Sequence, residues 1–144
     1  MLAQDSSPMR ARHGARELLV KALYQWQLAD HSEAELRAQF GDLPEFERID
    51  QAYFEDLLGA VLRDIGRLDR TIAAHSDRDV GQVDAVSRAV LLLGLAELRG
   101  REDVPTKVII NEAVELAKRY GPADCFRFVN AVLDGNAKSM PARS

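Results

Sequence analysis

The feature that most constrains the fold is a long periodic stripe of apolar residues between positions 50 and 75. Its members recur every three or four residues, which places them on one face of a helix: Phe54, Leu57, Leu58, Val61, Leu62, Ile65, Leu68 and Ile72. A stripe of this length predicts one helix over residues 50–75 that packs against other helices along its whole length. The sequence therefore favours an all-α bundle.

The other apolar patterns also have helical spacing. We expect further helices over residues 10–30, 33–40, 84–98, 104–120 and from 125 onward. The helix over residues 84–98 is apolar almost all round, which predicts the centre of the C-terminal half. No segment shows the sustained alternation of a strand, and none repeats like a solenoid. We expect an all-α, compact bundle of about six to seven helices in two packed helical subdomains.

Length and composition favour a single domain. A chain of 144 residues that is 47% hydrophobic can form one core without disulfides or metals. We expect flexible tails over residues 1–9 and 139–144 and one domain over residues 10–138. Its N-terminal and C-terminal helical units are expected over residues 10–75 and 82–138.

Several classes of protein are disfavoured. The longest uncharged apolar run, residues 89–96, is far shorter than the roughly twenty residues of a membrane-spanning helix, and the N-terminus lacks a signal-peptide core. The sequence shows no phosphate-binding loop, nucleophile elbow or metal-ligand spacing, and Cys125 on an apolar stripe indicates a structural thiol. We expect a cytoplasmic protein that is not an enzyme and needs no metal or cofactor.

Charge is distributed unevenly along the chain. The net charge of −4 argues against a protein that coats nucleic acid by bulk electrostatics. Residues 10–21 are nevertheless rich in arginine and lysine, whereas residues 30–56 are strongly acidic. The first segment suits phosphate and the second suits a basic protein, although solvation alone explains charged helical surfaces equally well.

Tyr24 is expected on the outer face of the first helix. At 100° per residue it lies almost opposite a core face made of Ala15, Leu18, Leu19, Ala22, Leu23 and Trp26. His13, Arg16, Val20 and Gln27 share or border the outer face. Cations, amides and an aromatic ring bind single-stranded RNA. The alternative is that Tyr24 covers a neighbouring helix and the arginines are simply solvated.

A second strip of this kind follows the helix break at Gly121 and Pro122, after which Asp124 is expected to cap the last helix. Arg127, Phe128 and Asn130 fall on the flank or far side of that helix, where packing alone does not explain them. If the fold brings the two strips together, they form a short track for single-stranded RNA.

Residues 104–121, VPTKVIINEAVELAKRYG, and residues 128–134, FVNAVLD, resemble the C-terminal half of the NusB family of transcription antitermination factors. Residues 15–28 and 53–69 are similar to that family as well, so the resemblance covers nearly the whole chain. It implies binding to the boxA element of ribosomal RNA leader transcripts together with the ribosomal protein NusE, in support of processive rRNA transcription. Other antitermination factors and RNA polymerase would be indirect partners.

The resemblance also implies the residues of the site. RNA binding is carried over to Arg10, Arg12, His13, Arg16, Tyr24, Arg127, Phe128 and Asn130. Asp84 and Asp124 are the candidates for contact with NusE, and each has a helix cap as its alternative role. His13 and Gly14 stand where the family more often has arginine, so we expect fewer phosphate contacts.

Two other functions remain open at this point. One is a helical protein-interaction adaptor without sequence-specific RNA binding. The other is a stand-alone relative of the RNA-binding domain of rRNA cytosine methyltransferases, for which the sequence contains no nucleotide-binding module.

Overall fold

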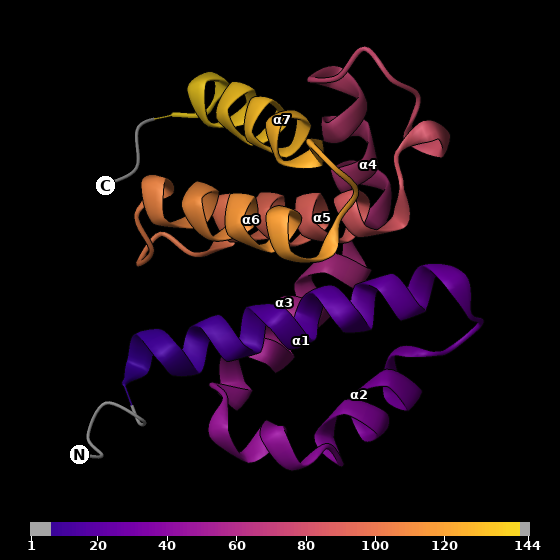
Figure 1. Cartoon of the computed structure of the whole chain (residues 1–144), viewed down its shortest axis with the longest axis vertical. Helices are drawn as coiled ribbons and strands as arrows, with labels where there is room; N and C mark the ends of the chain where they lie inside the picture. Colours follow the sequence, from indigo (N-terminus) through magenta and orange to yellow (C-terminus); the bar gives the residue numbers. More distant parts are fainter. Residues whose placement is uncertain (1–6, 142–144) are drawn as a thin grey trace.

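The computed structural model describes residues 7–141, which form α-helices, short 3-10 helices and no β-strand (Figure 1). The elements are α1 (Pro8–Leu28), α2 (Glu33–Gly41), η2 (Pro44–Arg48), α3 (Gln51–Arg63), α4 (Ile65–Ala74), η3 (Val80–Gln82), α5 (Ala85–Gly100), α6 (Thr106–Tyr120) and α7 (Cys125–Ser139). The all-α prediction is confirmed. No helix in the described part of the chain is long and apolar enough to span a membrane.

The two chain ends differ from the predicted tails. Residues 1–6 and 142–144 of those tails lie outside the described residues. Within the described part, α1 already begins at Pro8, a residue that suits the first helical turn because its missing N–H needs no partner there. At the other end, α7 continues to Ser139.

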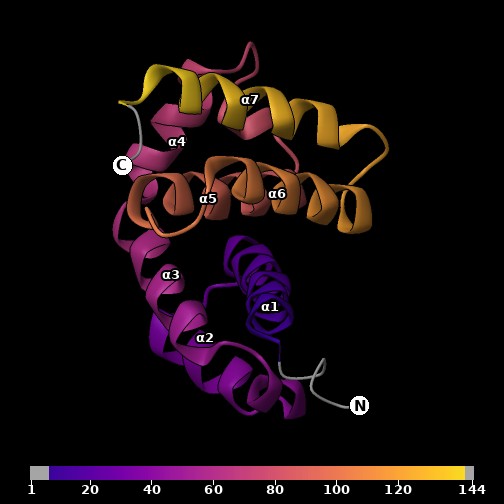
Figure 2. The same cartoon turned by 90° about the vertical axis from the view of Figure 1, so that its left-hand side faces the viewer.

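Helix α5, predicted as the central helix of the C-terminal half, lies at the centre of the whole described bundle. All of its residues from Ala89 to Leu98 are buried. It contacts α1, α3, α4, α6 and α7. Figures 1 and 2 show α7 on one side of the α5–α6 pair and α1 on the other. The first and last helices therefore lie on opposite sides of a shared central layer.

The prediction of one helix over residues 50–75 is wrong, because α3 and α4 meet at a break. The break is at Asp64, whose φ of −122° and ψ of 26° are not helical. On either side of it, α3 packs against both α1 and α5, whereas α4 packs against α5. The apolar spacing continues through the break from Val61 to Leu68, so the sequence pattern does not reveal it.

Side-chain caps fix several helix starts. The Asp50 carboxylate accepts a hydrogen bond from the Tyr53 N–H at 3.1 Å, and the Asp84 carboxylate accepts one from the Ser87 N–H at 2.9 Å. The predicted side-chain cap of α7 by Asp124 is wrong. The backbone of this residue is left-handed, with φ 64°, and its side chain makes no capping hydrogen bond. An N-cap residue normally has an extended backbone, which directs its side chain to the first turn.

Candidate nucleic-acid interface

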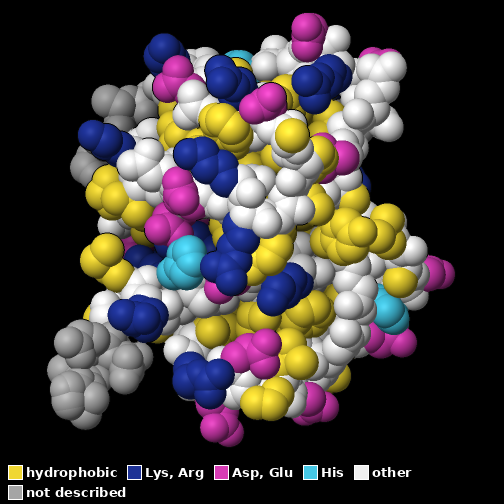
Figure 3. Space-filling view, in the orientation of Figure 1, with side chains coloured by type: hydrophobic (Ala, Val, Ile, Leu, Met, Phe, Trp, Pro, Cys, Tyr) yellow, Lys and Arg dark blue, Asp and Glu magenta, His cyan; other side chains and the backbone are white. Residues whose placement is uncertain are grey.

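A groove rich in basic residues runs beside α1, between η2 and the end of α6. Its volume is about 590 Å³, and it is lined by Arg10, His13, Gly14, Glu17, Leu18, Lys21, Glu45, Arg48, Ile49 and Arg119. We call it the basic groove. Its cationic residues outnumber the two acids, Glu17 and Glu45. Figure 3 shows Lys and Arg side chains gathered near the middle of the face that carries α1 and α6.

Contacts inside the basic groove neutralise Glu17. The Arg119 guanidinium lies 3.3 Å from the Glu17 carboxylate, and the Tyr120 hydroxyl donates a hydrogen bond to it at 3.1 Å. His13 lies 3.7 Å from Glu17 and 2.9 Å from Glu112. Lys21 is exposed and forms no ion pair with any residue of the described chain. The groove therefore keeps positive charge available for an anionic ligand.

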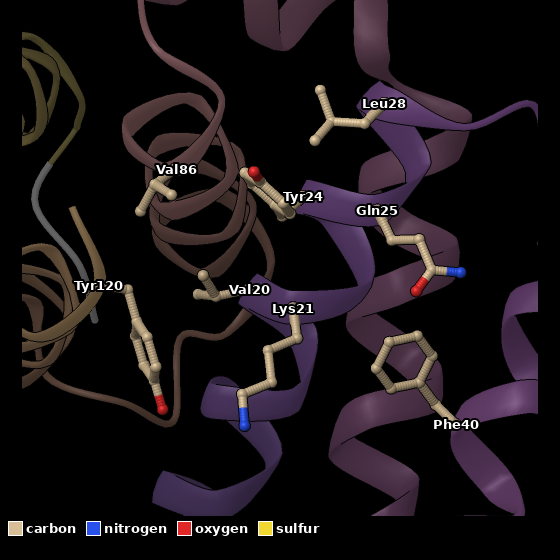
Figure 4. A pocket seen from close by; sticks show the side chains of 8 residues that line it. All are labelled: Val20, Lys21, Tyr24, Gln25, Leu28, Phe40, Val86 and Tyr120. Carbon is tan, nitrogen blue, oxygen red and sulfur yellow. The ribbon is translucent and has the colours of Figure 1, made fainter. Parts of the chain in front are cut away.

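An apolar hollow adjoins the basic groove. Its volume is about 580 Å³, and its lining residues are Val20, Lys21, Tyr24, Gln25, Leu28, Phe40, Val86 and Tyr120. Lys21 lines both depressions. Figure 4 shows the rings of Tyr24 and Tyr120, from two different helices, on either side of Val20. Tyr24 is 40% exposed, so its predicted outward position is confirmed.

Arg16 does not face solvent, which corrects the predicted outer face of α1. Only 3% of Arg16 is exposed, and Val20 beside it is also buried. The Arg16 Nε donates a hydrogen bond to the Glu97 carboxylate at 2.9 Å, and Nη2 donates one to the Tyr53 hydroxyl at 3.3 Å. Because α1 packs against both α3 and α5, its buried face is wider than the predicted stripe. Arg16 is therefore not placed to meet phosphate.

Arg16, Tyr53 and Glu97 form a cluster that we call the buried charge cluster. The Tyr53 hydroxyl also donates a hydrogen bond to Glu97, so one carboxylate joins α1, α3 and α5. Burial raises the pKa of the Glu97 carboxyl, while Arg16 and Tyr53 act in the opposite direction. Every charge in the cluster has a hydrogen-bonded partner, which is the condition for keeping ions in a protein interior.

The remaining predicted cations of α1 divide between two places. Arg10 is exposed and lines the basic groove. Arg12 is not among the groove residues. Its guanidinium lies 3.5 Å from Asp50, 3.4 Å from Asp103 and 4.4 Å from the centre of the Tyr53 ring. These contacts hold Arg12 against the α3 side of the helix.

The strip predicted on α7 is separate from the basic groove. Arg127 and Asn130 are exposed, whereas Phe128 is half-buried with the Arg78 guanidinium 4.3 Å from its ring centre. The described residues that line the groove and the hollow come from neither α7 nor its preceding turn. Because α7 and α1 lie on opposite sides of the α5–α6 pair (Figure 2), the fold does not join the two strips into one track.

Sequence reasoning missed part of the interface. Lys21 stands three residues before Tyr24 on the same helix, so its place beside the ring was available from helical spacing. Arg48, Arg119 and Tyr120 carry no such signal. They reach the groove or hollow only because η2 and the end of α6 fold against α1.

The two predicted partner residues differ in their surroundings. Asp84 is half-buried, and its carboxylate accepts the capping hydrogen bond from the Ser87 N–H. It stands two residues before Val86, which lines the apolar hollow, so it lies near the rim of that hollow. The Asp124 side chain is 77% exposed and lies 3.9 Å from Arg127.

Comparisons with known proteins agree with this architecture. The sequence model of the NusB family matches residues 13–138. The transcription antitermination protein NusB of Alcanivorax borkumensis is 44% identical over 136 residues, covering 94% of this chain and 91% of the relative. The protein of that name from Serratia proteamaculans is 45% identical over 130 residues, with coverage of 90% and 94%.

Solved structures give the same result. T. maritima NusB superposes with a TM-score of 0.79 at 31% identity, covering 91% of this chain and 93% of that one. A chain in the crystal structure of the antitermination factors NusB and NusE in complex with dsRNA has a TM-score of 0.77 at 27% identity, covering 92% of this chain and 99% of that one. The chain therefore belongs to the NusB family of transcription antitermination proteins.

Proposed function

We propose that this protein binds boxA-type single-stranded RNA along the basic groove, together with NusE, and so supports processive transcription of rRNA operons. One observation carries the proposal: a groove lined by cations opens beside a hollow lined by two tyrosines, and Lys21 borders both. A relative of this chain occurs in a structure with NusE and RNA, which supports the choice of partners. The protein would act in the cytoplasm by binding, without catalysis.

The basic groove and the apolar hollow would contact different parts of the RNA. Arg10, Lys21 and Arg119 supply positive charge for phosphates in the groove. Where the strand passes Lys21, an unstacked base can lie against the exposed Tyr24 ring. The Gln25 amide at the hollow offers hydrogen bonds to a base edge. His13, at the groove wall, adds charge when it is protonated.

The other predicted RNA residues have different roles in the proposal. Arg127, Phe128 and Asn130 on α7 form a separate contact for RNA outside the groove. Arg12 supports the start of α1 through Asp50 and contacts phosphate only at its exposed edge. Arg16 acts indirectly, because its bond to Glu97 fixes α1 against α5 and thereby shapes the groove.

NusE is proposed to contact the chain near Asp84 and Asp124. A carboxylate suits a basic ribosomal protein, and Asp124 is exposed enough to form an intermolecular ion pair. Asp84 lies near the apolar hollow, so a partner at that carboxylate would also come close to RNA that passes Tyr24. This closeness supports joint binding of the two ligands.

The test is fluorescence anisotropy of a labelled boxA-type RNA, with a scrambled RNA at the same salt concentration as reference. Each is titrated with the protein, alone and with NusE. We expect tighter binding to boxA, strengthened by NusE, and weaker binding for the double variant Lys21→Gln, Arg119→Gln. The matched control is Lys107→Gln, Lys138→Gln, which removes the same charge from exposed residues outside the groove.

The apolar hollow favours a second candidate, a protein-interaction adaptor without sequence-specific RNA binding. A hollow lined largely by aromatic and aliphatic side chains also suits an apolar side chain of a protein partner. In that case both RNAs bind weakly and equally even with NusE present, while Tyr24→Ala removes NusE binding alone.

A further inference from the structure

A second group of arginines lies outside the basic groove, on α2, α3 and α4. Arg63, at the end of α3, and Arg67 and Arg70, on α4, are exposed, and the last two are neighbours on one helix face. Figure 2 shows α3 and α4 following one another along one edge of the molecule. Within residues 7–141, the side chains of these three arginines form no ion pair or hydrogen bond. Their charge is not used by the fold.

Two guanidinium groups meet over a glycine at one end of this row. The Arg63 Nη1 lies 2.9 Å, and the Arg37 Nη2 3.1 Å, from the position that a Cβ atom of Gly59 would occupy. Because both nitrogens lie close to one point, they are no more than 6 Å apart, and like charges repel at that range unless an anion or carboxylates compensate them. Arg37 has such compensation from Glu33, at 2.6 Å, and donates a hydrogen bond to the Glu55 carbonyl at 3.0 Å. Arg63 has none.

The acids near this row are already engaged or stand alone. Asp56 lies 3.8 Å from Arg101, and Asp69 lies 2.7 Å from Arg88. Asp64, at the break between the helices, is exposed and adjoins Arg63 in sequence. With the carboxylates of Glu33, Glu55 and Asp64 counted, the four arginines at positions 37, 63, 67 and 70 still leave an excess of one positive charge, which favours an anionic ligand.

The chemistry of the surface favours RNA backbone over an acidic protein. Protein interfaces depend on buried aromatic or aliphatic anchors. The exposed large hydrophobic residues of the described chain are Met9, Tyr24, Leu28 and Val108, and none of them lies on α3 or α4. Arginine forks match phosphate oxygens well, and contacts made only to phosphates do not depend on sequence.

We propose that Arg37, Arg63, Arg67 and Arg70 form a second, sequence-independent contact for the phosphate backbone of RNA that extends beyond the basic groove. We call these residues the arginine row. The inference rests on the proposed function only in taking the ligand to be RNA. The row lacks an exposed aromatic ring for stacking, so it adds affinity for longer transcripts without adding base preference.

The experiment compares the wild type with one triple variant, which combines Arg63→Gln, Arg67→Gln and Arg70→Gln. Anisotropy is measured with a boxA-type RNA of about 12 nucleotides, a single-strand site length, and with the same RNA extended by a uridine tract. We expect equal affinity for the short RNA. For the extended RNA the variant should bind several-fold more weakly, with a salt slope of log K lowered by about 0.7 for each lost contact.

Two further variants separate charge from structure. The charge-preserving variant Arg63→Lys, Arg67→Lys, Arg70→Lys should keep the wild-type salt slope on the extended RNA. Gly59→Ala places a methyl group between the two guanidinium groups, and alanine suits the helix. We therefore expect this variant to bind the extended RNA more weakly while its circular dichroism spectrum shows an unchanged fold.

The outcomes distinguish this proposal from the function proposed above. If the wild type binds boxA RNA no more tightly than scrambled RNA, the proposed function is contradicted. The arginine row is judged separately, by the difference between wild type and glutamine variant on a poly(U) RNA. If wild type and the glutamine variant bind poly(U) and the extended RNA with equal affinity and equal salt slope, the proposal is overturned. Polyglutamate serves as a model of an acidic protein. A glutamine variant that loses binding to polyglutamate but keeps full binding to both RNAs would also overturn the proposal.

Discussion

The buried charge cluster and the basic groove use the same kinds of residue on the same helix for opposite purposes. In the cluster, Arg16 is 3% exposed and its guanidinium is held by Glu97 and Tyr53. In the groove, five residues further along the same helix, Lys21 is exposed and forms no ion pair within the described residues. Burial turns a cation into part of the fold, whereas exposure leaves it available to a ligand.

The two regions are also physically linked. His13 lines the groove and lies 2.9 Å from Glu112, whose carboxylate is 3.7 Å from Arg16. A change in the cluster can therefore move the groove wall without touching RNA. Measurements of stability and of RNA binding must be made on the same variants to separate the two effects.

The largest expected effect is on stability. Arg16→Ala leaves Glu97 buried without its ionic partner, so the free energy of unfolding should fall by about 3–5 kcal/mol. Urea denaturation followed by circular dichroism measures it. The double variant Arg16→Met, Glu97→Met removes both charges and should recover part of the loss, because the buried Tyr53 hydroxyl then loses both of its hydrogen-bond partners. A loss below about 1 kcal/mol for Arg16→Ala would show that the cluster is not a structural unit.

The next effect is on RNA binding and should leave the fold intact. Tyr24→Ala removes the exposed ring beside the groove, and we expect a loss of about 1–3 kcal/mol in RNA binding with little change in salt slope. Tyr24→Phe keeps the ring and should bind like wild type. Anisotropy titrations check both variants. If Phe weakens binding as much as Ala, the hydroxyl rather than stacking is responsible.

A smaller effect tests whether Asp84 contacts NusE or only caps α5. Asp84→Ala removes the capping bond to the Ser87 N–H, which should lower the free energy of unfolding by about 1 kcal/mol. Asp84→Asn keeps a capping side chain but loses the charge. Reduced NusE binding for Asn at unchanged stability would assign the carboxylate to the partner. Unchanged NusE binding would leave Asp84 with its capping role alone.

The smallest effect on stability is expected for Asp124→Ala. Its carboxylate is exposed and makes only a long contact with Arg127, so the unfolding midpoint should not change measurably. NusE binding, measured by calorimetry, should weaken. A clear drop in stability would mean that Asp124 supports the α6–α7 turn and is not a surface contact.

Helical spacing predicted the fold better than it predicted the site. The stripe of α3 and α4 and the apolar α5 follow from local periodicity, because burial on one helix face repeats at a fixed interval. The burial of Arg16 depends on Glu97 and Tyr53, which are remote in sequence. A helical wheel places Arg16 beside His13 on an outer face, and only the packing of α3 and α5 shows otherwise.

The resemblance to a known family supplied what spacing could not. It implied RNA-binding residues at the start of α1 and in the FVN motif, and it implied RNA and NusE as partners. It did not distinguish Arg10, in the groove, from Arg12, held by Asp50 and Asp103. Nor did it indicate Arg48 and Arg119, because their position depends on how η2 and α6 meet α1.

The most direct test of the division between fold and binding is the salt dependence of boxA-type RNA binding for three proteins. These are wild type, the groove variant Lys21→Gln, Arg119→Gln, and the cluster variant Arg16→Met, Glu97→Met. We predict that the groove variant lowers the slope of log K against log salt by about 0.7 per lost contact, while the cluster variant keeps the wild-type slope. A lowered slope in the cluster variant with an unchanged slope in the groove variant would contradict the account.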